Sequence, residues 1–239
     1  MLGLAFSFLS ALSTIAGGLI PIYTRVREMD TRYLIGFASG VMVSVALLAM
    51  LPEMAKEGGI NFIALAVGFF SIYLVEKMVL LHSCPEGVML GECEFHTIGW
   101  TSLIGIAAES LLDGVAIVIS FSLAPAVGVT VALAVIAHEF PRGFTTAAIM
   151  QGAGYSRVRV LGALAIDSLF TPVGAALVLL GLFPQSFYVP LFSFAAGTFL
   201  YVGASDLMPE AHRRFNIRVV ALVMLGVVLI PLVELVTGI

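Results

Sequence analysis

Long apolar stretches dominate this sequence and restrict the folds open to it. Runs long enough to cross about 30 Å of hydrocarbon as helices recur along the whole chain, at roughly residues 2–22, 34–52, 60–81, 98–121, 126–150, 158–181, 187–208 and 218–238. They are continuous rather than alternating, which argues against the strands of a membrane barrel. Charged residues make up 11% of the chain, about half of what soluble domains carry. We therefore expect an all-α polytopic membrane protein with eight transmembrane helices in a single domain, residues 1–239.

Basic residues predict the orientation of these helices. The first, fifth and seventh connections carry the arginines Arg25, Arg27, Arg32, Arg157, Arg159, Arg213, Arg214 and Arg218. The even-numbered connections together carry only Lys56. The positive-inside rule then places the odd connections in the cytoplasm and both termini outside, in a plasma or inner membrane. The first run lacks a basic leader, so we interpret it as a retained helix and not a signal peptide. The lipid bilayer is the expected surrounding, and no nucleic-acid partner is expected.

A weak internal repeat relates the second and seventh runs. At a constant offset of 157 residues, six positions are identical: Phe37/Phe194, Ala38/Ala195, Gly40/Gly197, Val45/Val202, Pro52/Pro209 and Glu53/Glu210. In the predicted topology the two runs cross the membrane in opposite directions, which is typical of inverted repeats in transporters. This predicts a 3+2+3 arrangement: one repeat over about residues 1–82, a cytoplasmic loop over about 82–97, two core helices over 98–150, and a second repeat over about 157–239.

Ionisable side chains lie deep inside two of the apolar runs. Glu109 and Asp113 are four residues apart in one run, and His138 and Arg142 are four apart in the next. Residues four apart share a helix face, so each pair points in one direction. An ionised side chain at the bilayer centre costs roughly 2.5–3.5 kcal/mol on insertion scales. We therefore expect these two faces to meet and form a polar site near the midplane.

Further polar residues surround this predicted site. Ser110 and Glu139 sit one position round the helix from the main faces, which suggests a neighbouring sub-site. The next run adds Asp167, with Thr171 on the same face. A buried ion-pair network is the alternative, but four acids here meet only one arginine and one histidine. Carboxylates with an imidazole and little compensating charge favour a divalent cation. The candidate metal ligands are Glu109, Ser110, Asp113, His138, Glu139 and Asp167, with Arg142 and Thr171 modulating the site.

The third connection offers a second, accessory candidate. It contains both cysteines of the chain and two histidines, His82, Cys84, Cys93 and His96. Thiolates and imidazoles can hold zinc tetrahedrally, but the spacing matches no zinc-finger pattern. An ordinary surface loop remains the alternative, and a structural disulfide is not expected on the cytoplasmic side.

The motifs of the two polar runs resemble those of the ZIP (Zrt/Irt-like) divalent-metal transporters. The stretch from Ala108 to Ala116 is similar to the family pattern His-Asn/Ser-x-x-Asp/Glu-Gly, and His138 to Gly143 is similar to His-Glu-x-Pro-Glu-Gly. The segments 75–77 and 199–210 also resemble the family. The resemblance implies eight spans in a 3+2+3 inverted repeat, both termini outside, and a homodimer. It further implies that Asp113 and His138 are primary ligands, with Ser110 and Glu139 at a second sub-site.

Two positions depart from the family pattern. Glu109 stands where the family has a histidine, and Arg142 stands where it has an acid after proline. A carboxylate can still ligate as a harder oxygen donor, whereas a guanidinium stays protonated and cannot. Arg142 can therefore take the place of a second metal ion, or it can pair with Glu109 or Asp113 and disable transport.

The expected function is transport of a divalent metal toward the cytoplasm, with zinc first and iron or manganese next. The metal is the transported substrate, and no organic cofactor is expected. One alternative is a non-transporting sensor or regulatory homologue locked by Arg142. An intramembrane metallohydrolase is a weaker one, because the zinc motif that begins with His138-Glu139 has Arg142, not histidine, at its fifth position. We therefore expect a protein that is not an enzyme.

Overall fold

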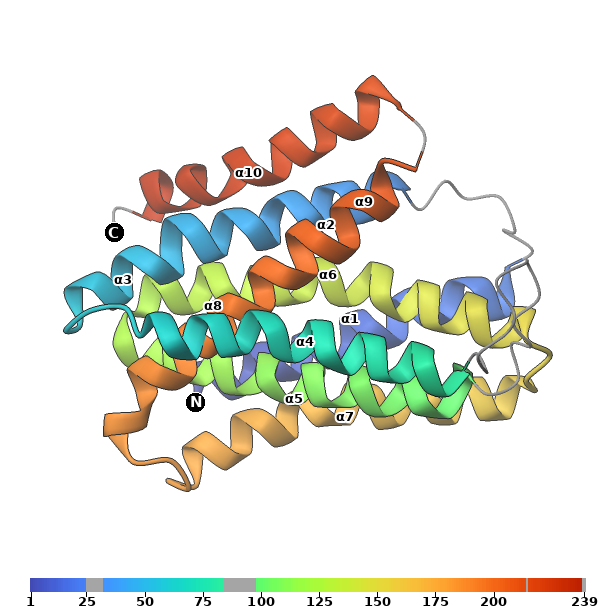
Figure 1. The fold of residues 1–239 in the computed structure, drawn as a ribbon, viewed down its shortest axis with the longest axis horizontal. Coiled ribbons are helices and arrows are strands. Elements are labelled where there is room, and N and C mark those ends of the chain that lie inside the picture. The colour runs from blue at the N-terminus through green and yellow to red at the C-terminus, as the bar shows by residue number, and fades with distance from the viewer. Residues whose placement is uncertain (25–31, 84–97, 214, 238–239) are drawn as a thin grey trace.

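The computed structural model describes residues 1–24, 32–83, 98–213 and 215–237, and all elements in these ranges are helical (Figure 1). They are α1 (Leu2–Tyr23), α2 (Arg32–Ser44), η1 (Val45–Met50), α3 (Leu51–Lys56), α4 (Phe62–Ser83), α5 (Ile98–Leu123), α6 (Pro125–Gly152), α7 (Arg157–Leu179), η2 (Gln185–Phe187), α8 (Tyr188–Leu200), η3 (Tyr201–Leu207), α9 (Met208–Ala211) and α10 (Ile217–Thr237). Because α2, η1 and α3 are continuous, as are η2, α8, η3 and α9, each predicted run corresponds to one helical segment. Every predicted boundary lies within four residues of the observed one.

Six of these segments are long and apolar enough to cross a membrane. They are Leu2–Tyr23, Arg32–Lys56, Gly105–Leu123, Pro125–Gly152, Arg157–Leu179 and Gln185–Ala211. In α10 the apolar stretch among the described residues, Ile217–Val233, is shorter. A polytopic helical membrane protein is therefore confirmed, and the count of eight crossings stays a prediction.

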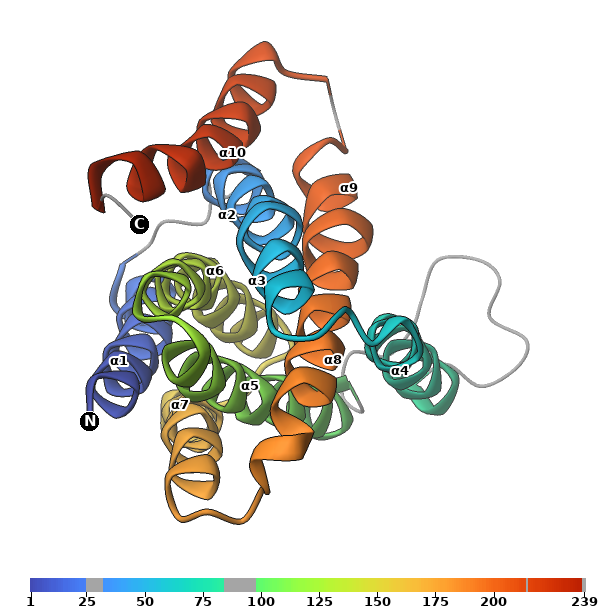
Figure 2. The same ribbon diagram turned by 90° about the vertical axis from the view of Figure 1, so that its left-hand side faces the viewer.

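Two groups of four segments make up the molecule. The first group, bundle A, contains α1, α5, α6 and α7, and the second, bundle B, contains α2–α3, α4, α8–α9 and α10. Seen end-on in Figure 2, bundle A occupies the lower left, and bundle B runs from the top to the right. The most extensive packing, α1 on α6, α5 on α7, α2 on α10 and α4 on α8, is all within bundles. Each bundle thus combines helices from both halves of the predicted repeat.

Close backbone contacts hold the helix pairs within each bundle. A Cβ atom on Gly17 would lie 2.0 Å from the carbonyl oxygen of Phe140, and one on Gly143 would lie 2.0 Å from that of Thr14. Only glycine permits this approach, as in other tightly packed membrane helices. The same reciprocal contact joins the other three pairs through Gly114 and Gly174, Gly40 and Gly226, and Gly68 and Gly197.

Two wide helical turns interrupt the long segments of bundle B. Both η1 and η3 are π-helical, and η3 ends with the Met208 N–H donating to the Gly203 carbonyl, five residues back. Each is followed by a proline, Pro52 or Pro209. Proline lacks an N–H and crowds the preceding turn of an α-helix, so we attribute the wide turns to these prolines. The predicted repeat therefore shares a backbone feature as well as sequence identities.

Short connections use local chemistry to reverse the chain. Gly58 and Gly59 follow α3 with φ angles of 111° and 114°, a region that favours glycine. Asn61 then accepts a hydrogen bond from the Ala64 N–H at 2.9 Å and caps α4. Between α5 and α6, Ala124 is extended, and Pro125 starts the next helix. The α5–α6 hairpin is therefore tight, which brings the polar middles of these two helices to the same depth.

Candidate metal site

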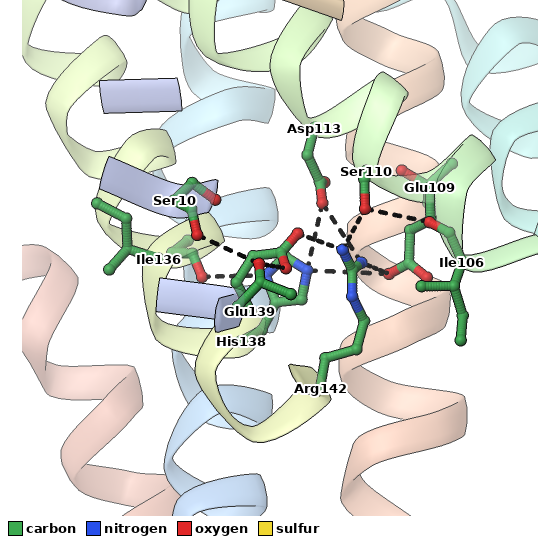
Figure 3. A network of polar contacts seen from close by, with 12 residues as sticks. Ser10, Ile106, Glu109, Ser110, Asp113, Ile136, His138, Glu139 and Arg142 are labelled. Atoms are coloured by element: carbon green, nitrogen blue, oxygen red, sulfur yellow. Dashed lines mark hydrogen bonds and ion pairs between the residues drawn. The ribbon is translucent and has the colours of Figure 1, made fainter. Parts of the chain in front are cut away.

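The ionisable residues of α5 and α6 meet in the middle of bundle A, as the sequence predicts. Asp113 and His138 are almost fully buried, with 2% and 1% of their side chains exposed. Glu109 and Arg142 are 15% and 12% exposed. Figure 3 shows these side chains converging, with Glu109 and Asp113 projecting from α5 toward His138 and Arg142 on α6.

Three of these side chains form a compact set of donor atoms. One donor atom each from Glu109, Asp113 and His138 lies within 4.8 Å of the other two. The His138 Nε2 atom is 3.3 Å from Asp113 Oδ2 and 3.9 Å from Glu109 Oε1. Two carboxylate oxygens and one imidazole nitrogen at these separations can close on a single divalent cation.

The orientation of His138 suits a ligand. Its Nδ1 atom lies 3.2 Å from the Ala134 carbonyl oxygen, one turn earlier on α6. A carbonyl can only accept, so Nδ1 carries a proton, and in the neutral ring the Nε2 lone pair then faces the carboxylates. A backbone carbonyl behind the other ring nitrogen is the usual way in which proteins fix a metal-binding histidine. The ring also packs edge-on against Phe199 of bundle B, with centroids 6.4 Å apart.

The three facing atoms have no hydrogen-bond partner within the part of the chain that the structure describes. Glu109 Oε1, Asp113 Oδ2 and His138 Nε2 are all buried and unsatisfied. Buried polar atoms normally find partners, because an unsatisfied one costs about 1–3 kcal/mol. A bound cation would satisfy all three atoms, whereas Arg142 lies at ion-pair distance from only the two carboxylate oxygens.

Arg142 lies among four carboxylates. Its Nη1 atom is 3.4 Å from Glu109 Oε1 and 3.7 Å from Asp113 Oδ2. Its Nη2 atom contacts Glu139 directly and lies 3.5 Å from Asp167 Oδ1. The sequence left open whether Arg142 pairs with Glu109 or Asp113; the arginine pairs with both and reaches the second pair of acids as well.

Ser110, Glu139 and Asp167 gather on the far side of the guanidinium. The Arg142 Nη2 group donates to the Ser110 hydroxyl, which in turn donates to Asp167 Oδ1 at 2.6 Å. These residues come from three helices, α5, α6 and α7. The six candidate ligands thus divide into a set of three donors and a set of three that holds Arg142. Thr171, four residues after Asp167 on α7, is fully buried, and its hydroxyl has no hydrogen-bond partner within the described part of the chain.

A residue of α1 that is not among the candidates predicted from the sequence also belongs to this network. The Thr14 hydroxyl donates to Glu139 Oε2. Thr14 continues a buried polar face of α1 that includes Ser7 and Ser10. Residues three and four apart share one face of a helix, so this spacing of hydroxyl groups in an apolar helix indicates a polar face. The accessory candidates His82, Cys84, Cys93 and His96 lie outside the residues whose side chains the structure describes, so that site stays a prediction.

A family model described as "ZIP Zinc transporter" matches residues 89–234, more than half of the chain. The chain belongs to this family. The matched region includes all six candidate ligands and Arg142. The description of the family is that of a zinc transporter.

Individual relatives agree with this assignment. The zinc transporter ZupT of Chlorobium chlorochromatii (strain CaD3) is 26% identical over 236 residues, which cover 87% of each chain. The metal cation symporter ZIP8 of Rattus norvegicus is 29% identical over 132 residues, or 54% of this chain and 28% of that protein. The zinc transporter ZIP10 of Mus musculus is 27% identical over 128 residues, or 53% of this chain and 15% of that protein. The chain thus spans only a small part of the two mammalian relatives.

Proposed function

We propose that this ZIP-family chain transports a divalent metal ion across a membrane, with Glu109, Asp113 and His138 as the ligands at the midplane. The observation that carries the proposal is the convergence of the three buried, unsatisfied donor atoms. The alternative of a purely structural ion-pair network is less satisfactory, because four carboxylates face one guanidinium and one imidazole. A divalent cation supplies the missing positive charge.

Zinc is the favoured candidate substrate, and iron or manganese is the next. The proposed direction of transport is toward the cytoplasm. Zinc appears in the names of the family model and of several relatives. One imidazole and two carboxylates also suit borderline ions such as ferrous iron. The homodimer that the family resemblance implies stays a prediction.

The proposed mechanism is alternating access between the two bundles. All of the candidate ligands project from α5, α6 and α7, so bundle A holds the whole site. Among the described residues, the reciprocal glycine contacts all join helices of the same bundle. Motion of bundle A against bundle B would therefore expose an intact site to each side in turn. The helix packing supports a division of the moving parts between these two bundles.

The inverted repeat itself remains part of the proposal. Three observations support it: the identities at offset 157, the two π-helical turns before Pro52 and Pro209, and the glycine contacts at Gly17 and Gly174, which are again 157 residues apart. A second helix that runs the opposite way with the same irregularity is typical of such repeats.

The proposed orientation places both termini outside the cell. The second connection, which contains Glu57, would then face outward, and the third, which contains both native cysteines, would face the cytoplasm. In intact cells a membrane-impermeant maleimide should label a Glu57→Cys variant of a chain that lacks Cys84 and Cys93. The native cysteines should react only after permeabilisation. The reverse labelling pattern would invert the topology.

Uptake by reconstituted vesicles tests the proposed function. Purified protein in vesicles that enclose a metal-sensitive dye should admit Zn²⁺, Mn²⁺ or Fe²⁺ added outside. Asp113→Asn and His138→Gln each remove a ligand while keeping the shape of the side chain, so uptake should fall to background. Glu57→Gln, a carboxylate-to-amide change at an exposed position, is the matched control. Undiminished uptake in either site variant would exclude that residue from the site.

A non-transporting, metal-sensing homologue is the second candidate, because Arg142 pairs with the same acids that would hold the metal. The two candidates differ in one measurement. A sensor would bind metal through Asp113 and His138 but admit none to the vesicles. Saturable uptake by the wild-type protein would remove this candidate.

A further inference from the structure

The two ends of the Arg142 guanidinium are held very differently. Nη2 hydrogen-bonds to the Ser110 hydroxyl and to the Glu139 carboxylate. Nη1 faces Glu109 and Asp113 at 3.4 and 3.7 Å. Neither Nη1 nor Nε makes a hydrogen bond to the described part of the chain. One end of the guanidinium is therefore anchored, and the other rests on electrostatic attraction alone.

The anchored end lies in a polar pocket of its own. Glu139 and Asp167 supply two carboxylates, and Ser110 supplies a hydroxyl oxygen. Thr14 fixes Glu139 from α1, and Ser110 fixes Asp167, so the pocket is built from all four helices of bundle A. Two carboxylates and a hydroxyl form an oxygen-rich set that would suit a cation, and here the cation is the side chain of Arg142.

The loose end meets the proposed metal ligands. The oxygens nearest Nη1 are Glu109 Oε1 and Asp113 Oδ2. These two oxygens also lie 3.9 and 3.3 Å from His138 Nε2, within the three-donor set. An ion bound there and the Nη1 group would therefore share the same oxygen atoms. Since a guanidinium remains charged at all physiological pH values, this competition cannot be switched off by loss of a proton from Arg142.

We propose that Arg142 is a built-in competing cation. Its Nη2 end permanently fills the position beside the three-donor set, so the chain binds one midplane ion and not two. Its Nη1 end draws Glu109 and Asp113 away from the transported ion, which weakens binding and favours release. The inference rests on the proposed metal site, which it extends by assigning a role to the one cationic side chain in contact with the described ligands.

Binding of Mn²⁺ to the purified protein tests this role, with equilibrium dialysis to count ions and electron paramagnetic resonance to detect pairs of ions. Arg142→Gln removes the charge, and Arg142→Glu replaces it with a further carboxylate. Arg218→Gln removes a positive charge from an exposed position near the start of α10 and is the matched control. Gel filtration and thermal melting in detergent identify variants that fold.

The wild-type protein and Arg218→Gln should bind one magnetically isolated Mn²⁺ ion with the same affinity. Arg142→Gln should bind that ion about tenfold more tightly or better, because a like charge some 3–4 Å from the ligand oxygens has gone. Arg142→Glu should bind two ions with a spin-coupled spectrum. A merely structural arginine would change the melting temperature of these variants without changing stoichiometry or affinity.

Two coupled ions in the wild-type protein would overturn the inference without any variant. Folded Arg142→Gln and Arg142→Glu proteins that bind one ion with wild-type affinity would also overturn it. A failure of the underlying site looks different: the wild-type protein and Asp113→Asn would then bind Mn²⁺ equally or not at all. That result would remove the proposed function together with this inference.

Discussion

Glu109 is the residue at which this chain differs most directly from the donor set of its family. Its carboxylate takes the place of an imidazole in the family pattern and lies 3.9 Å from His138 Nε2. Oxygen donors favour harder ions, and nitrogen donors favour zinc. Glu109→His should therefore raise the affinity for Zn²⁺ relative to Mn²⁺ by about tenfold or more. Competition between the two ions for the purified protein measures that ratio, and an unchanged ratio would place Glu109 outside the coordination sphere.

Thr14 is the residue whose role required the structure. Its hydroxyl donates to Glu139, a fully buried carboxylate that also binds Arg142. Thr14→Val removes this hydrogen bond at nearly constant volume and should lower the stability of the folded protein by about 1–3 kcal/mol.

Thermal melting in detergent measures the effect of Thr14→Val. Thr130→Val is the matched control, because the Thr130 hydroxyl is equally buried but bonds to the Ala126 carbonyl in its own helix. Equal melting temperatures for the two variants would contradict a structural role for the Thr14 contact.

The pairs Glu109/Asp113 and His138/Arg142 were predictable because helix periodicity places residues four apart on one face and burial cost forces such faces together. Which acids contact each end of the Arg142 guanidinium was not predictable. Helix spacing carries no information about that. Thr14 was missed because hydroxyls are common in membrane helices, and the spacing of Ser7, Ser10 and Thr14 marks a polar face without identifying a partner 125 residues away.

Helix pairs in this protein depend on glycines that admit a neighbouring backbone. Gly143 is the informative case, because it lies one residue after Arg142 and packs on α1. A Cβ atom there would lie 2.0 Å from the Thr14 carbonyl oxygen, so α1 must shift to accept a methyl group. Gly143→Ala should therefore destabilise the protein by roughly 1–3 kcal/mol or more and weaken metal binding by displacing Thr14 from Glu139.

Gly162→Ala is the control for that substitution. Gly162 is also inside a helix, α7, but a Cβ atom there meets nothing within 4 Å. Replacing glycine by alanine at such a position raises helix stability by up to about 1 kcal/mol. Melting temperatures and Mn²⁺ affinity measured on both variants check the comparison, and a harmless Gly143→Ala would mean that α1 and α6 are not packed as the structure has them.

Helix existence and extent were readable from hydropathy, because every run of the required length became a helical segment. The π-helical turns were not. Pro52 and Pro209 indicated a local irregularity in each helix. A helix can accommodate a proline by a kink, a break or a wide turn, and the packing around the proline decides which of these forms. Here η1 packs on α8 and on α6, and η3 packs on α2, so both wide turns contact segments far apart in sequence.

At the scale of the whole molecule, the division of the helices into two bundles could not be predicted from the sequence. The repeat suggested that consecutive helices form the units, yet α1 and α7 each leave their own repeat to pack with α5 and α6. Which helices pair is decided by matching small residues on distant faces. A pattern of glycines indicates which face of a helix packs closely, but it does not indicate which other helix packs on that face.

Motion between the bundles leads to a prediction about cross-links. A Cβ atom on Gly105 of α5 would lie 3.1 Å from Val75 Cγ1 of α4, so Gly105→Cys with Val75→Cys would join bundle A to bundle B. A Cβ atom on Gly3 of α1 would lie 3.1 Å from Val118 Cγ2 of α5, so Gly3→Cys with Val118→Cys would join two helices of bundle A. In each pair the two side-chain positions are in direct contact, so the two thiols would be neighbours.

In a chain without Cys84 and Cys93, oxidation of the first pair should stop vesicle uptake, and reduction should restore it, because the site could no longer face both sides. Oxidation of the second pair should leave uptake nearly unchanged, since those two helices would travel together. Single-cysteine variants show whether the substitutions themselves are tolerated, and a mass shift on non-reducing gels or in intact-mass spectra shows whether each link has formed. Full uptake through a chain linked between α4 and α5 would mean that the two bundles do not move apart there, and the site must then open by local movements around His138 and Phe199.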